Sequence, residues 1–247
     1  MTEADIVADG LDTQIRQFPF QFPGSSPLLE ERIRLAAGVS DGLTERGLIR
    51  RGKLLPELEE GFRLLSRYHF AIAVMGTIAS DRETYARVCA DARSGVLVVA
   101  DGEQIGLQPI RAEELLRAAI GLLPALPPGP GQSVTVTQQA KTPARVGADD
   151  EGFQIPFVQG GSSSGAAQQR AAEEILRRPR TGAGYFVGNR RDPTGETVNT
   201  PALNWLDTDA GRYMVTSGQS GDGATWATYS PADYPRIERK LYESIYT

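Results

Sequence analysis

Two stretches decide the fold: Gly95-Val-Leu-Val-Val-Ala-Asp101-Gly102, and Gly211-Arg-Tyr-Met-Val215 with Asp222-Gly223 a few residues later. In each, an apolar run that favours a strand leads to Asp-Gly, the dipeptide typical of a tight hairpin turn. After each Asp-Gly turn we expect the second strand of the hairpin, followed by a helix. The second hairpin differs from the first by a short insertion.

The surroundings of the two stretches also match. Upstream, each begins with a helix that runs into a strand, over 58–70 and 175–186. Downstream, Leu116 and Ile120 of the first helix correspond to Ile237 and Leu241 of the second. A duplication predicts an α+β protein of two quasi-twofold-related halves with a central antiparallel β-sheet, and not a parallel doubly wound sheet. Chance similarity between two hairpin-helix units is the alternative.

The remaining periodicities place the other elements. A single domain over 1–247 is expected, with an N-terminal half at 15–123, a Pro/Gly-rich connector at 124–165 and a C-terminal half at 166–247. An edge strand is expected at 17–23, because proline is tolerated there. The last helix is expected to start with Ser230 as N-cap and Pro231 at the first position. Expected helices are 27–46, one from Pro56, 111–123 and 166–178; expected strands are 69–78, 85–90, 95–100, 104–109, 133–137, 184–191, 202–206, 212–217 and 225–229.

Composition excludes several classes of protein. The 247 residues carry a net charge of -5, which argues against a general nucleic-acid binder, because phosphate binding needs a basic surface. No apolar run is long enough to span a bilayer, and the acidic start of the chain does not have the form of a signal peptide. A lone cysteine, Cys89, cannot form an internal disulfide and fits a reducing cytoplasm.

The same inventory argues against an enzyme. The only histidine, His69, begins an apolar strand, and Cys89 lies in Arg-Val-Cys-Ala-Asp, which is typical of a small core residue. A zinc site needs about four nitrogen or sulfur ligands, which these two residues cannot supply. We therefore expect no catalytic residues, no cofactor and no metal.

One glycine-rich segment, Gly182-Ala-Gly-Tyr-Phe-Val-Gly188, has the letters of a dinucleotide-binding loop. Such a loop must follow a strand and open a helix, whereas here a helix comes before it and a turn after it. A small-ligand or nucleotide-binding domain using Gly182–Gly188 therefore remains only an alternative hypothesis. A structural dimerisation module built on exposed strands is another.

Basic residues cluster around this segment in an otherwise acidic protein: Arg177, Arg178, Arg180, Arg190 and Arg191. Cations suit the C-terminal end of a helix, so a solvated helix end explains the cluster. The functional interpretation is a patch that attracts an acidic partner surface.

A series of motifs runs along nearly the whole chain: Phe18-Pro-Phe20, Leu43-Thr-Glu-Arg-Gly-Leu48, Leu55-Pro-Glu-Leu58, Gly95-Val-Leu-Val-Val99, Leu122-Leu-Pro124, Pro127-Pro-Gly-Pro-Gly-Gln-Ser-Val134, Gly184-Tyr-Phe-Val187, Trp205-Leu-Asp-Thr208, Gly211-Arg-Tyr213, Trp226 and Pro231. In this order the motifs resemble the EspG family, the ESX secretion-associated proteins of actinobacteria. The segment between Ile78 and Tyr85 is shorter than the corresponding loop of many relatives.

The resemblance implies an α+β fold with quasi-twofold halves, whose sheet is flanked by helical bundles. It also implies a non-catalytic cytosolic chaperone of type VII (ESX) secretion. Such a chaperone binds the hydrophobic tip of a PE-PPE-like helical heterodimer, keeps it soluble and delivers it for secretion. A homodimer is possible when the client is absent.

Contact residues follow from what such a tip requires. Arginines supply bidentate contacts and long-range attraction, and aromatic side chains supply apolar area. We expect the partner-binding residues to be Arg16, Phe18, Arg180, Tyr185, Arg190 and Arg191. Neither nucleic acid nor membrane insertion is expected.

Overall fold

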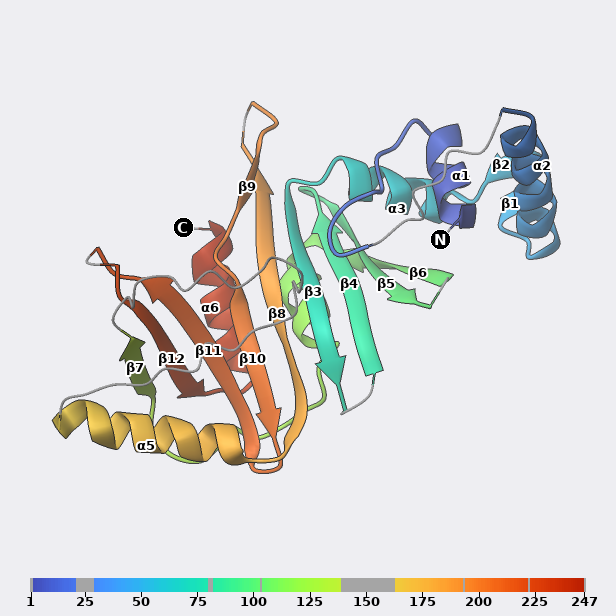
Figure 1. Cartoon of the computed structure of the whole chain (residues 1–247). Coiled ribbons are helices and arrows are strands. Elements are labelled where there is room, and N and C mark those ends of the chain that lie inside the picture. The colour runs from blue at the N-terminus through green and yellow to red at the C-terminus, as the bar shows by residue number, and fades with distance from the viewer. Residues whose placement is uncertain are drawn as a thin grey trace.

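The computed structural model describes residues 2–20, 29–79, 82–102, 104–138, 163–192, 194–221 and 223–246. Its main feature is a large antiparallel sheet with the strand order β6-β5-β4-β3-β8-β10-β11-β12-β7, while β9 pairs with β8 alone (Figure 1). The strands are β3 (Phe70–Ile78), β4 (Arg82–Ala90), β5 (Ser94–Asp101), β6 (Gln104–Arg111), β7 (Val134–Gln138), β8 (Arg180–Arg191), β9 (Thr197–Asn199), β10 (Leu203–Thr208), β11 (Gly211–Gln219) and β12 (Thr225–Pro231). The α+β class and the antiparallel sheet are confirmed.

Two meanders with the same order of elements make up the sheet. Strands β3 to β6 follow α3 (Pro56–Ser66) and precede α4 (Leu115–Ile120). Strands β8, β10, β11 and β12 follow α5 (Ser163–Arg177) and precede α6 (Tyr234–Tyr246). The first strands of the two meanders, β3 and β8, pair antiparallel at the centre, with Val74 opposite Phe186.

The helices cover the two faces of the sheet differently. Helices α4 and α6 pack together on one face, where Leu116, Ile120, Ile237 and Leu241 join a single apolar core with Trp205. On the other face, α3 packs over β4, β5 and β6. Helix α5 packs beside β7 and joins the core of β10, β11 and β12. In the described part of the chain, no helix covers β3 and β8 on this second face, which we call the open face (Figure 1).

The N-terminal helices lie at one end of the molecule. Helix α1 (Thr2–Gly10) contacts α2 (Leu29–Glu45), which runs into the small hairpin of β1 (Ile49–Arg50) and β2 (Lys53–Leu54). Figure 1 places α2 beyond α1, away from the sheet. A left-handed glycine, Gly47 with φ 71°, ends the α2 segment as the sequence predicts.

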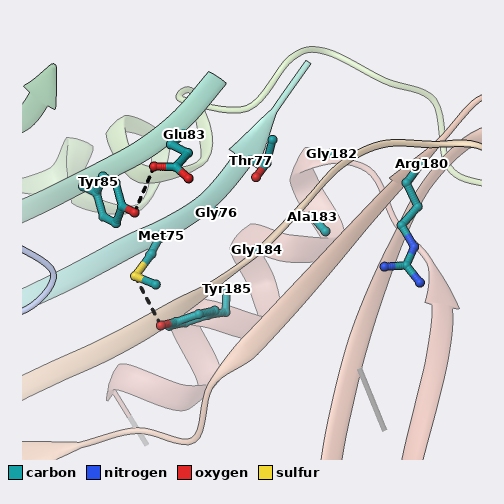
Figure 2. Close-up of a pocket in the computed structure, with 10 residues that line it drawn as sticks. All are labelled: Met75, Gly76, Thr77, Glu83, Tyr85, Arg180, Gly182, Ala183, Gly184 and Tyr185. Atoms are coloured by element: carbon teal, nitrogen blue, oxygen red, sulfur yellow. Dashed lines mark hydrogen bonds between the residues drawn. The ribbon is translucent and has the colours of Figure 1, made fainter. Parts of the chain in front are cut away.

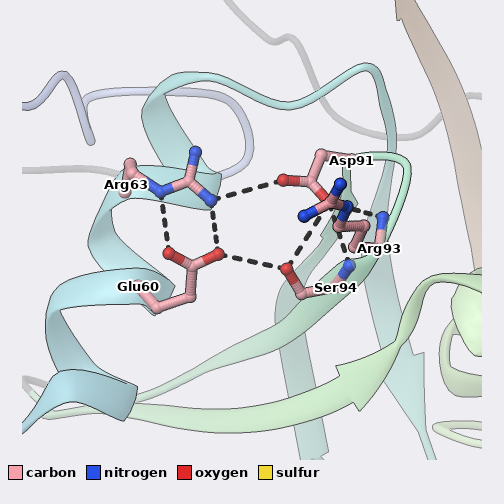
Figure 3. Close-up of polar contacts among 5 residues, drawn as sticks. All are labelled: Glu60, Arg63, Asp91, Arg93 and Ser94. Atoms are coloured by element: carbon pink, nitrogen blue, oxygen red, sulfur yellow. Dashed lines mark hydrogen bonds and ion pairs between the residues drawn. The ribbon is translucent and has the colours of Figure 1, made fainter.

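A polar network ties α3 to the β4–β5 turn (Figure 3). Arg63 pairs with Glu60 one turn away and, at 3.3 Å, with Asp91 of the turn. Asp91 also accepts hydrogen bonds from the backbone N–H groups of Arg93 and Ser94. Burial alone would raise the pKa of Asp91, but these donors and the Arg63 guanidinium outweigh it and hold the pKa at about 2.

A buried ion pair anchors the connector to the second meander. The Arg212 guanidinium, which is 0% exposed, donates to both carboxylate oxygens of Asp207, at 2.6 and 2.8 Å. It also donates to the Pro124 carbonyl at 2.9 Å and stacks over the Tyr234 ring. The connector therefore begins at a fixed point of the sheet.

One edge of the sheet is formed by β6. Pro109 lies within β6 and has no N–H group, so it donates nothing on either side of the strand. The N–H group of Arg111 is taken by the Glu114 carboxylate at 2.8 Å.

Two expectations about local structure were wrong. Residues 17–20 form no strand, because the Phe20 N–H bonds back to the Gln17 carbonyl in a turn; 21–23 lie outside the described residues. The last helix begins at Tyr234, since Ser230 and Pro231 still pair with β11. Its cap is Asp233, whose carboxylate accepts from the Arg236 N–H at 3.0 Å. Strand β9 was not predicted.

Candidate protein-docking surface

The open face carries a shallow pocket over β3, β4 and β8 (Figure 2). Its volume is about 340 Å³, and its lining is Met75, Gly76, Thr77, Glu83, Tyr85, Arg180, Gly182, Ala183, Gly184 and Tyr185. Successive side chains of a strand point to opposite faces, so Met75 and Tyr185 face outward while Val74 and Phe186 enter the core. The pocket is therefore built on sheet strands, with Arg180 at the start of β8.

Glycines let the strands under this pocket pack closely together. A Cβ atom added at Gly76 would lie 2.5 Å from the Gly184 Cα atom, and one at Gly184 would lie 2.3 Å from the Trp205 ring. Strands β3 and β8 can approach, and Trp205 can pack beneath them, only without side chains at these positions. This is the packing reason for the glycine-rich segment.

The same segment is unsuited to holding a phosphate. Residues 182–188 form the middle of β8 and pair with β3 on one side and with β10 for most of their length on the other. A dinucleotide loop needs free backbone N–H groups at a helix N-terminus, which a doubly paired strand does not offer. The nucleotide-binding alternative for Gly182–Gly188 is therefore not supported by the geometry.

An aromatic pair borders the pocket. Phe18 stacks on Tyr185 with a ring-centre distance of 6.3 Å and an interplanar angle of 14°. The Phe18 side chain is 50% exposed, and the Tyr185 hydroxyl contacts the Met75 sulfur at 3.4 Å. Together these three side chains present an accessible apolar surface.

An arginine that sequence reasoning missed supports this aromatic pair. Arg87 of β4 is only 3% exposed and donates from Nη1 to the Phe18 carbonyl at 2.6 Å. Its guanidinium and that of Arg191 both lie over the Tyr68 ring, at 5.0 and 4.7 Å. The alternation of β4 could have placed Arg87 on the open face, but nothing in the sequence connects it with Phe18.

Charges of opposite sign border the pocket (Figure 2). Arg180 is exposed and forms no ion pair with any described residue. Across the pocket, the Tyr85 hydroxyl donates to the Glu83 carboxylate at 3.2 Å. The pKa of Tyr85 is raised, mainly by burial and to a smaller extent by its hydrogen bond to this carboxylate. A ligand seated here would meet apolar side chains at the centre, a cation on one side and an anion on the other.

The structure brings together only some of the predicted contact residues. Phe18, Tyr185 and Arg180 share the open face, and Arg191 lies on it farther along β8. The alternation of β8 directs Arg190 to the opposite face, beside Phe70. Arg16 pairs with Asp5 of α1 at 3.0 Å.

The residues most able to act as nucleophile or base lie outside the pocket. His69 is exposed just before β3. Cys89 is completely buried, and burial raises the pKa of its thiol to about 11. Within the described ranges, no group of three or more His, Cys, Asp or Glu side chains could hold a metal ion, and no helix is long and apolar enough to cross a membrane.

An α+β protein with a broad, partly apolar and oppositely charged sheet face is suited to contact another protein. The chain belongs to the EspG family, because the family's sequence model matches residues 1–243. No curated protein matches the chain. Among solved structures it is similar to the Mycobacterium tuberculosis type VII secretion system chaperone EspG5 in complex with the PE25-PPE41 dimer. The identity is 11% and the TM-score 0.60, over 99% of this chain and 93% of EspG5.

Proposed function

We propose that this protein is a cytosolic chaperone of type VII secretion that binds a PE-PPE-like helical heterodimer. The observation that carries the proposal is family membership over 1–243 together with a fold shared with EspG5, which was solved with a PE-PPE dimer bound. The protein keeps the client soluble by covering its hydrophobic tip and delivers it for secretion. It performs no catalysis.

The open face is the client-binding surface in this proposal. An apolar helical tip is stabilised by burial against Phe18, Tyr185 and Met75, and aromatic anchors of this kind dominate the energetics of most interfaces. Arg180 and Glu83 orient the tip, because charges at the rim favour one direction of approach. A standard interface covers about 800 Å² per partner, so contacts extend beyond the pocket along β8 towards Arg191.

We also propose that the two halves of the chain are related by a quasi-twofold axis between β3 and β8, with helical bundles flanking the sheet. Support comes from the shared order of helix, four main strands and helix, and from the antiparallel pairing of β3 with β8. Leu116 and Ile120 of α4 and their counterparts Ile237 and Leu241 of α6 are all buried in one core.

The test is affinity for a co-expressed PE-PPE heterodimer, measured by titration calorimetry. Phe18→Ala and Arg180→Glu should each weaken binding at least about tenfold. The loss in Arg180→Glu should shrink as salt rises, because screening weakens a rim charge. Tyr242→Ala is the matched control, since Tyr242 is 57% exposed but belongs to α6 on the other face.

Two outcomes would contradict the proposal in different ways. If the wild-type protein binds but both variants bind equally well, the client uses another surface. If no PE-PPE heterodimer binds the wild-type protein, the chaperone function itself is wrong.

A further inference from the structure

A small basic hairpin lies at the end of the molecule away from the open face. Strands β1 and β2 form it beside α2 (Figure 1). Its tip is Arg50-Arg51-Gly52-Lys53, and all four residues are exposed. None of the three cations forms an ion pair with any residue that the structure describes. The tip is therefore a compact, unopposed positive charge on an otherwise acidic protein.

The backbone of this tip is unfavourable for arginine. Pairing of Arg50 with Lys53 leaves a two-residue turn, whose central residues both have positive φ, 53° at Arg51 and 72° at Gly52. Positive φ at both positions is the type I′ pattern, which favours Asn-Gly. Glycine adopts it freely, whereas the Cβ atom of an arginine makes the left-handed conformation costly. Turn formation alone therefore does not explain Arg51.

The strand pairing of the hairpin is unfavourable as well. Arg50 and Lys53 lie directly opposite each other, and like charges at such a pair destabilise the two strands. Arg51 adds a third positive charge in the turn between them. Local rules of this kind are broken chiefly where a residue is needed for function. A negatively charged partner would offset both the repulsion and the strain.

We infer that this hairpin tip binds a short acidic segment of a second protein, distinct from the client. The arginine forks match carboxylates in a bidentate manner, and Lys53 adds a point charge. The hairpin lies with α2 beyond α1, away from the open face (Figure 1). The acidic segment and the client can therefore be bound at the same time.

Flanking charges favour a narrow acidic segment over a broad anionic surface. Glu45 ends α2 just before the hairpin, and Glu57 and Glu59 lie in the first turn of α3 just after it. All three carboxylates are exposed. A membrane of anionic lipids would also approach these carboxylates, and the net charge of -5 would oppose it further. A peptide segment that reaches only the tip avoids this repulsion.

The test is fluorescence anisotropy of a labelled octaglutamate peptide with the full chain. The salt concentration is about 0.15 M, which screens charges more than about 8 Å away. The wild-type protein should bind octaglutamate and not octaglutamine. Arg50→Glu and Lys53→Glu should each weaken binding at least about tenfold, because each places a carboxylate at the tip. Arg170→Glu, an equal charge change at an exposed position of α5, is the matched control and should leave binding unchanged.

A second measurement separates binding from a structural role. Lys53→Glu turns the like-charge pair into an opposite-charge pair, and Arg51→Asn supplies the residue that the turn favours. Both variants should slow amide hydrogen exchange in residues 48–55 while weakening peptide binding. If the cations served the hairpin itself, the same variants would instead exchange faster.

Several results would overturn the inference. The wild-type protein could bind octaglutamate no better than octaglutamine, or the hairpin variants could bind it as well as Arg170→Glu does. Tighter binding to inorganic phosphate, or to vesicles of equal parts phosphatidylserine and phosphatidylcholine, would assign the tip to another anion. Affinity of the hairpin variants for the PE-PPE heterodimer should match the wild type. A failure of this inference is therefore distinguishable from a failure of the chaperone function.

Discussion

The ion pair between Arg212 and Asp207 offers the most direct test of the packing of the second meander. In Arg212→Leu, the Asp207 carboxylate, whose side chain is 2% exposed, loses both of its guanidinium hydrogen bonds. Removing one partner of a buried pair costs about 3–5 kcal/mol, because the remaining charge is left without compensation. The Pro124 carbonyl loses its donor as well. We therefore expect the free energy of unfolding to fall by at least about 3 kcal/mol.

This loss is large enough to measure in two ways. For a chain of this size, each kcal/mol corresponds to about 2–4 °C in Tm, so the midpoint should fall by about 6–20 °C. Urea unfolding followed by tryptophan fluorescence gives the free energy directly, since Trp205 lies in the adjacent core. Arg212→Leu combined with Asp207→Leu should regain at least half of the loss, because no buried charge then remains.

A neighbouring ion pair serves as the control. Arg178 pairs with Asp209 at 3.8 Å, but their side chains are 30% and 50% exposed. Exposed pairs contribute little, so Arg178→Leu should cost less than about 1 kcal/mol. The reasoning would be refuted if Arg212→Leu cost no more than this control, or if the double variant were less stable than Arg212→Leu.

Three further predictions concern charge, pH and thiol chemistry. Arg191→Glu, on the open face, should slow association with the client at least about tenfold at low salt, as measured by stopped flow, and less at high salt, whereas Arg190→Glu on the opposite face should slow it less. The pKa of Asp91 is about 2 in the folded protein against 3.8 ordinarily, so its contribution to stability is present above about pH 4 and is lost as pH falls through about 2. Arg63→Met should therefore make stability in urea depend less steeply on pH in that window. Cys89 should react with a thiol reagent at least about a hundredfold faster in the unfolded than in the native protein, because it is 0% exposed and its thiol pKa is raised.

Each of these predictions has its own control. Glutamate at Arg50 and Arg51 should leave association unchanged; equal slowing there would point to net charge and not to a local contact. A pH profile of Arg63→Met that coincides with wild type would remove the network from the acid response. Rapid labelling of Cys89 in the native protein would show that β4 opens readily.

How far the sequence predicts this fold depends on whether the signal is local. Gly47 with its positive φ, Pro56 at the start of α3 and the turn at Gly102 are set by neighbours in the chain, and each was predictable. Ser230 and Pro231 form a convincing helix start by composition. Pairing with β11 overrides it and moves the cap to Asp233.

The candidate site is predictable only in part, for the same reason. Tyr185 and Phe18 attract attention as aromatic residues, but their stacking joins segments far apart in the chain. Arg87, which holds the Phe18 carbonyl, is indistinguishable in sequence from an ordinary surface arginine. Arg190 and Arg191 are adjacent in sequence, yet strand alternation sends them to opposite faces.

The edge strand β6 has a consequence for the protein at high concentration. An unblocked edge is a template on which further strands, including those of unfolded chains, can add and grow into aggregates. In β6, Pro109 has no N–H to offer, and that of Arg111 is already held by Glu114. An incoming strand would therefore find no backbone N–H donor at these two positions near one end of β6. This edge thus resists fibril-like growth, which is a particular risk for a protein whose clients are prone to aggregate.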